Sequence, residues 1–225
     1  MLFRQRPALQ NSDIAYDEGV LTSDVLMAYS EFTLRRAKEE LNLTLVEGGR
    51  FLPPINPIAP NPYLAEFLQE SLPLAIAMGS EKARSELIIS PILFEVRKLL
   101  NRQISFFSGE DFTVDPAAGL SGVCDFLISR SPEQLLIEAP VVVIVEAKKE
   151  NLKGGLGQCM AEMVAVQRFN QSKGKDIPTI YGSVTSGNLW KFLKLEGETV
   201  TIDLTDHLIP PVDVLLGTLI WMIQS

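Results

Sequence analysis

The chain has 225 residues, of which 46% are apolar, and a formal net charge of -8 at pH 7. This length is enough for one sizeable core, so we expect one large α/β domain with extra N-terminal elements rather than two full domains. The acidic balance argues against a protein that coats nucleic acid non-specifically.

Membrane and secretory signals are not evident in the sequence. Residues 1–10 lack the apolar run of a signal peptide. Residues 212–223 are apolar, but they are too short to cross a bilayer and contain Asp213. Cys124 and Cys159 lie among apolar neighbours, which favours two buried free thiols over a disulfide framework. We therefore predict a cytoplasmic protein without a membrane partner.

The first predicted element is a helix that Ser23 and Asp24 cap and that runs to about Leu41. Five prolines follow within residues 51–62. Because proline lacks an N–H donor and has a fixed φ, this stretch is predicted to be an extended linker. The predicted division is thus an N-terminal helical extension with a linker, 1–62, and a main domain, 63–225.

Two helices are predicted next, over residues 63–78 and 80–101. Pro91 lies inside the second, where we expect a kink or break because an interior proline costs about 3 kcal/mol. Glu86 and Glu95 lie on opposite edges of this helix's apolar stripe. Each is either a site residue or the polar border of an amphipathic helix. We expect Glu86 to face the site and Glu95 to border solvent or another helix.

Asp125 stands in the second of two predicted strands, 105–114 and 123–129. An aspartate among apolar strand residues is costly to desolvate unless a cation or a hydrogen-bond donor compensates it. The alternative is an aspartate at the strand end that faces solvent.

The most informative stretch runs from Pro140 to Asn151. Its run of β-branched residues, Val141 to Val145, predicts a strand buried on both faces. Glu146 and Lys148 follow two residues apart, so they share one face where the strand leaves the core. A carboxylate and an ammonium placed in this way suit a metal-dependent hydrolase, although an ordinary surface ion pair has the same spacing.

After this strand the sequence predicts a helix over 156–171, with Gln158 in its first turn. The alternative for this residue, and the simpler one when it is taken alone, is a solvated first-turn glutamine. Three further strands (179–184, 188–195 and 199–204) and a closing helix (212–223) complete the chain. The segment 146–194 is the only long one with an excess of basic side chains. It is either one wall of a phosphate-facing groove or an ordinary fluctuation of composition.

The order of these parts resembles the PD-(D/E)XK nuclease superfamily over about residues 80–195, especially its small, uncharacterised stand-alone bacterial members. The resemblance rests on polar residues in a fixed order along the chain: Glu86, Gly122-x-x-Asp125, Glu146-Ala-Lys148 and Gln158. The chain departs from the pattern at Cys124, where the eponymous proline is expected, and at Glu162, where a tyrosine often follows the glutamine.

The resemblance implies an α/β/α layered, restriction-endonuclease-like fold with a mixed central sheet. It also implies a metal-dependent DNA endonuclease that uses magnesium (Mg2+) or manganese (Mn2+). In this family the Asp, the Glu and a helix Glu hold the cation, the Lys orients or activates water, and the Gln supports the site. Those roles would fall on Asp125, Glu146, Glu86, Lys148 and Gln158, with the backbone carbonyl of Ala147 as a further ligand.

Two function classes stay open from the sequence. The first is the metal-dependent deoxyribonuclease, with DNA as its partner and with a homodimer kept open beside a monomer. The second is a module that binds nucleic acid or protein and keeps the nuclease fold without turnover. The intact set of two carboxylates and a lysine favours the first, because a module that only binds has no need of all three.

Overall fold

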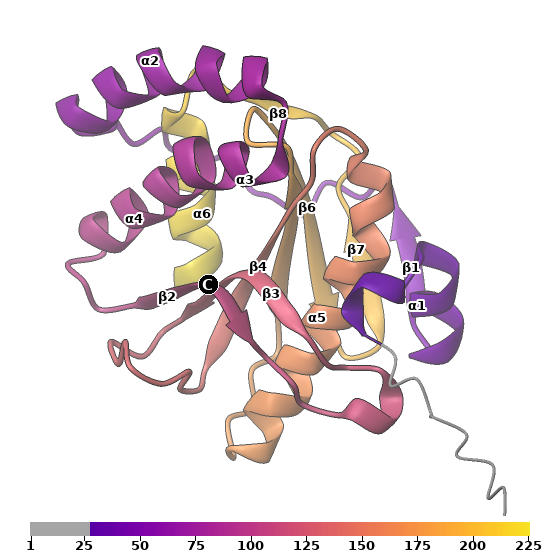
Figure 1. Ribbon diagram of the computed structural model, residues 1–225. Coiled ribbons are helices and arrows are strands. Elements are labelled where there is room, and N and C mark those ends of the chain that lie inside the picture. Colours follow the sequence, from indigo (N-terminus) through magenta and orange to yellow (C-terminus); the bar gives the residue numbers. More distant parts are fainter. Residues whose placement is uncertain (1–27) are drawn as a thin grey trace, which may run out of the picture.

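The computed structural model describes residues 28–225, and an open mixed β-sheet with helices on both faces forms its centre (Figure 1). The fold is therefore of the mixed α/β class. Two clusters of buried apolar side chains, one on each face of the sheet, make up the core. Among the described residues there is no helix whose length and apolar content would let it span a bilayer. The predicted cap at Ser23 and Asp24 lies outside the described residues.

The sheet has the strand order β1-β7-β6-β5-β4-β3-β2, and β8 adds to β6. The pairs β4–β5 and β1–β7 are parallel, whereas all other neighbours are antiparallel. The strands in chain order are β1 (Thr44–Glu47), β2 (Ser105–Asp111), β3 (Val123–Ser129), β4 (Val141–Ala147), β5 (Ile180–Thr185), β6 (Leu189–Glu196), β7 (Thr199–Ile202) and β8 (His207–Leu208). All seven residues of β4 are buried, as its run of β-branched residues predicts.

The helix α5 (Leu152–Ser172) connects β4 to β5 and covers one face of the sheet (Figure 1). The short helices η1 (Tyr29–Glu31) and α1 (Leu34–Glu40) pack on α5. Their close approach depends on Gly157, because a Cβ there would lie only 2.3 Å from the backbone carbon of Thr33. Near the other end of α5, the Asn170 amide hydrogen-bonds both the N–H and the C=O of Val141, which fixes α5 against the start of β4.

The other face of the sheet is covered by α6 and the helical run α3-η2-α4, and α2 packs on the outside of that run (Figure 1). Their bounds are α2 (Pro62–Met78), α3 (Glu81–Arg84), the π-helical η2 (Ser85–Ile89), α4 (Ser90–Leu99) and α6 (Asp213–Gln224). A last short helix, η3 (Pro116–Ala118), lies between β2 and β3.

Several elements differ from the sequence-based expectation, among them the two-residue strand β8, where no strand was expected. The helix expected up to Leu41 is interrupted in its described part, because Phe32 is extended and Thr33 starts α1 as its N-cap. The strand β1 was not expected from the sequence, and its four residues are mostly exposed. At Pro91 the chain stays helical, and the irregularity is the π-helical η2 directly before it.

Candidate functional site

The end of β4 places its charged residues on the face that α5 covers. Along β4, Ile144 belongs to the core cluster on the α5 side and Val145 to the cluster on the opposite side. Because side chains alternate along a strand, Glu146 points towards α5 again. Its side chain is completely buried. Lys148, two residues further, lies on the same side, and 24% of its side chain is exposed.

Asp125 lies beside Glu146 on the neighbouring strand. The last antiparallel pair of β3 and β4 is Phe126 with Val145, so the next step places Asp125 opposite Glu146. Its Oδ2 accepts a hydrogen bond of 2.8 Å from the backbone N–H of Ala147. Burial raises the pKa of Asp125, although this hydrogen bond and the Lys148 charge act in the opposite direction. Asp125 is therefore a partly buried neighbour of Glu146 rather than a solvent-facing residue at a strand end.

The Lys148 ammonium joins β4 to α5. Its Nζ lies 2.5 Å from Glu146 Oε1 and donates a hydrogen bond of 3.3 Å to Gln158 Oε1. Burial opposes the charge of Lys148, but the neighbouring carboxylates, Glu146 first, raise its pKa above the ordinary value. Lys148 is thus a cation held between a carboxylate and an amide oxygen.

A second buried carboxyl group, that of Glu162, lies one helical turn after Gln158. Glu162 Oε1 accepts a hydrogen bond of 3.0 Å from Gln158 Nε2. Glu146 and Glu162 are within hydrogen-bonding reach of each other. Apart from the Lys148 ion pair, no donor among the described residues reaches either oxygen of Glu146, and none reaches Glu162 Oε2. Two ionised carboxylates offer only acceptors, so a proton or a cation must lie between them.

The pKa values of this carboxyl pair follow from its surroundings. Burial, followed by the charge of Asp125, raises the pKa of Glu146 to about 8. Burial, followed by the charge of Glu146, raises the pKa of Glu162 well above its ordinary range. Near neutral pH and without a cation, the pair therefore holds a proton.

The structure does not place Glu86 at this site, which corrects the expectation from the sequence. The Glu86 side chain is 59% exposed, and its carboxylate pairs with Lys82 at 2.7 Å. The cause is the position of the helix. Its apolar residues pack on the sheet face opposite to the one towards which Glu146 points.

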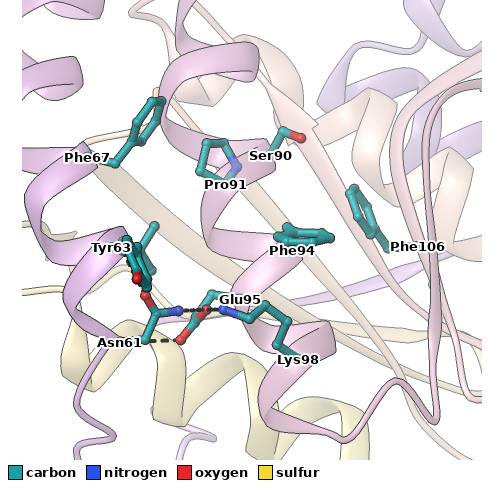
Figure 2. A pocket seen from close by; sticks show the side chains of 10 residues that line it. Asn61, Tyr63, Phe67, Ser90, Pro91, Phe94, Glu95, Lys98 and Phe106 are labelled. Carbon is teal, nitrogen blue, oxygen red and sulfur yellow. Dashed lines mark hydrogen bonds and ion pairs between the residues drawn. The ribbon is translucent and has the colours of Figure 1, made fainter.

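Glu95 borders another helix, as expected. Its buried carboxylate accepts hydrogen bonds from the N–H and the side-chain amide of Asn61, the N-cap residue of α2. Lys98 Nζ lies 3.0 Å from Glu95 Oε2. Figure 2 shows this carboxylate between Asn61 and Lys98, at the edge of a pocket that Tyr63 and Phe94 help to line. Glu95 thus stabilises the start of α2.

Two further carboxylates, to which the sequence analysis assigned no role in the site, lie near it. Glu81, at the start of α3, accepts a hydrogen bond of 3.0 Å from the Lys149 N–H, and its charge acts on Asp125 and Lys148. Its sequence signal was only that of an acidic first-turn residue after the Ser80 cap. Glu162 had a clearer signal, because it follows Gln158 by four residues and therefore shares its helix face.

A divalent cation at this site would need several oxygen ligands from the protein and from water. Among residues 28–225, no three His, Cys, Asp or Glu side chains are grouped so that they could hold a metal ion together. The ligands that the protein can offer at this site are the carboxylates of Asp125 and Glu146 and the carbonyl of Ala147. Magnesium keeps several waters and is often bound through one or two carboxylates. The buried Glu146 Oε2, which no donor reaches, is a free acceptor for such an ion. The residues therefore fit a hard cation that keeps several water ligands, rather than a cation whose ligands all come from the protein.

Comparisons with protein-family models, with curated proteins and with solved structures find no match for this chain.

Proposed function

We propose that the chain is a metal-dependent phosphodiester hydrolase, and in particular a DNA endonuclease with a restriction-endonuclease-like α/β/α fold of the PD-(D/E)XK type. The observation that carries the proposal is the end of β4. There, the Lys148 ammonium lies 2.5 Å from the Glu146 carboxylate, beside Asp125. This arrangement lies at the end of a buried strand and provides the two kinds of group that phosphodiester hydrolysis requires. The carboxylates can hold a metal ion, and the partly exposed ammonium can stabilise negative charge on the phosphate.

Each residue of the site has a definite task in this proposal. Asp125, Glu146 and the Ala147 carbonyl would hold the magnesium or manganese ion. When bound, the ion polarises the phosphodiester and lowers the pKa of water. Lys148 binds a non-bridging phosphate oxygen and stabilises the negative charge that develops there. Gln158 holds the Lys148 ammonium through its Oε1. Glu86 has no task, because it points into solvent.

Exposed basic side chains near the strand end support DNA as the substrate. Lys149 directly follows Lys148, Lys153 lies in the first turn of α5, and Lys82 lies next to Glu81 on α3. Lysines at such positions neutralise backbone phosphates without reading base sequence. Binding should therefore weaken as salt concentration rises.

One observation favours the second candidate function, a module that binds without turnover. The described residues contain no group of three metal-ligating side chains, and Lys148 already neutralises Glu146. A chain that has lost its cation could keep such an ion pair for stability alone. A direct measurement of DNA cleavage distinguishes the two candidate functions.

The test is cleavage of single-stranded, double-stranded and branched DNA with magnesium or manganese, and with chelator as the blank. Lys148→Met should lower turnover by at least about 100-fold while DNA binding stays nearly intact, since this lysine acts mainly in the transition state. Glu146→Ala should remove both cation binding and cleavage. Lys175→Met, at an exposed lysine beyond the far end of α5, is the matched control and should cleave normally.

The outcomes separate the two functions. Wild-type protein that binds DNA and cation but cuts none of the substrates would favour the binding module. Cleavage that Lys148→Met and Glu146→Ala leave unchanged would come from a contaminant.

A further inference from the structure

Glu162 is a fully buried carboxyl group to which the proposed chemistry has so far given no task. Burying a carboxyl group is costly unless its oxygens find partners. Its Oε1 has one protein donor, the amide nitrogen of Gln158, at 3.0 Å. Glu162 is thus the end of a chain of polar contacts that starts at β4. This chain runs from Glu146 to the Lys148 ammonium, on to the Gln158 amide and finally to Glu162.

The Gln158 amide can work in this chain in one orientation only. An ammonium is a donor without acceptor capacity, so the Gln158 atom that faces Lys148 must be the oxygen. The nitrogen must then face Glu162, whose Oε1 is an acceptor in both protonation states of the carboxyl group. The other contact of the Gln158 side chain is that with Lys148 itself. Without an acceptor at residue 162, the amide is therefore free to rotate and present its N–H groups to the ammonium.

We propose that Glu162 is a positioning residue, which holds the Gln158 amide with its oxygen towards Lys148 and thereby keeps the ammonium beside Glu146. The inference rests on the proposed hydrolase function for its catalytic consequence. Its structural part, the orientation of the Gln158 amide, stands independently of any cleavage activity.

Glu162→Leu is the primary test variant. It removes the acceptor and fills the position with an apolar side chain of similar size. The lost acceptor of the Gln158 amide lowers stability, and removing a carboxyl group that is buried beside Glu146 offsets part of this cost. The protein is therefore expected to stay folded. Its kcat for DNA cleavage should fall about 10- to 100-fold, as is typical when a partner that orients a site residue is lost, while KM changes by less than about threefold.

A double-mutant cycle with Gln158→Leu separates positioning from other roles. If Glu162 acts through Gln158, Glu162→Leu should change kcat by less than about twofold once Gln158 has been replaced, because the two residues act as one unit. The matched control is Gln167→Leu, which removes a glutamine on the same helix whose amide donates to the Gly197 carbonyl. It should leave kcat unchanged. The exchange variant Q158E/E162Q should recover most of the activity, because the donor and the acceptor have only changed places.

The second readout is the side-chain amide signal of Gln158 in a 1H–15N spectrum of the metal-free protein. Its protons should exchange slowly in the wild type and rapidly in Glu162→Leu, while the backbone spectrum stays the same. Wild-type protein that cuts no DNA but shows this difference would support the positioning and defeat the hydrolase. An unchanged amide signal in Glu162→Leu would overturn the positioning. So would a loss of kcat by Glu162→Leu that persists in the Gln158→Leu background.

Discussion

The residues at the end of β4 form a site in which negative charge outweighs positive charge. The Lys148 ammonium pairs with Glu146, and Asp125 and Glu162 lie close enough to Glu146 to affect its charge. Glu146 and Glu162 are both fully buried, so they cannot both be ionised without a compensating cation. The arrangement therefore makes the site sensitive to both pH and divalent ions.

The stability of the metal-free protein should depend on pH through Glu146. The pKa of Glu146 in the folded state, about 8, is above its ordinary value of 4.5. Between these values the folded state binds more protons than the unfolded state, so the free energy of unfolding should fall as pH rises from about 5 to 8. Glu146→Gln, which keeps the shape without titrating, should remove much of this slope. Urea titrations at several pH values measure the free energy of unfolding. Equal slopes with pH in the wild type and in Glu146→Gln would contradict a raised pKa of Glu146.

At the residue scale, the sequence predicted best what depends on strand periodicity. Asp125, Glu146 and Lys148 come together because alternation and antiparallel pairing fix their positions. Gln158 joins them because α5 begins directly after β4. Glu86 was misplaced because helical periodicity gives the edge of an apolar stripe but not the sheet face that the helix covers. Glu162 was noted only as the residue that stands in place of a tyrosine, because the sequence alone does not show that this position is buried beside Glu146.

At the scale of elements, the helical run α3-η2-α4 shows how the fold accommodates Pro91. In a regular helix the N–H of residue 91 would bond to the carbonyl of Leu87, four residues earlier, and proline has no N–H. The π-helical η2 lies in this region. The hydroxyl of Ser71, on α2, donates a hydrogen bond of 2.8 Å to the Leu87 carbonyl. The neighbouring helix thus supplies the missing donor.

Ser71→Ala should therefore lower the free energy of unfolding by about 1–3 kcal/mol, because it leaves the Leu87 carbonyl without a donor. In a Pro91→Ala background the new N–H can bond to that carbonyl, so the same change should cost less than about 1 kcal/mol. Ser172→Ala is the matched control, since its exposed hydroxyl also donates to a helix carbonyl. Chemical denaturation measures the free energy of unfolding of the wild type and of each variant, and equal costs of Ser71→Ala in both backgrounds would refute the explanation.

A second prediction at this scale concerns Gly157, where α5 passes the start of α1. Gly157→Ala should cost more than about 2 kcal/mol, because its Cβ would meet backbone atoms of Phe32 and Leu34 within 2.6 Å. Gly154→Ala, where the nearest atom is the movable Asn151 side-chain nitrogen at 3.1 Å, is the control. Thermal unfolding measures the loss of stability in each variant. Similar losses in both would mean that α1 can move away from α5 without a cost in stability.

Most elements of the main domain were predictable because their hydrophobic periods are strong. The strands β3 to β7 and the helices α2, α5 and α6 lie within a few residues of their expected bounds. The failures come from tertiary context. The strand β1 exists because β7 offers it a parallel partner, and its four residues carry no alternation of burial that a sequence pattern would reveal. The helix expected up to Leu41 was interrupted where Phe32 enters the core.

At the scale of the whole molecule, the N-terminal extension is built into the core. Tyr29, Phe32, Leu41 and Leu43 are buried in the cluster on the α5 side. The Tyr29 hydroxyl donates a hydrogen bond of 2.5 Å to the Phe112 carbonyl, which connects η1 to the segment after β2. These contacts attach the N-terminal part to the core of the main domain. The division at residue 62 stays a prediction, and it can be tested by producing the main domain without the N-terminal part.

The last prediction is the result of that separation. A chain that begins at Asn61 loses four large buried side chains, each contributing about 1.5–3 kcal/mol, and exposes β7 as an open sheet edge. This loss is comparable to the whole stability of a typical domain, about 5–15 kcal/mol. We therefore expect the shortened chain to be insoluble or to unfold without cooperativity, which circular dichroism and urea titration would detect. A chain that begins at Ala28 keeps η1, α1 and β1 and serves as the control. Cooperative unfolding of the chain from Asn61, with a native-like near-ultraviolet spectrum, would mean that residues 63–225 form an independent domain.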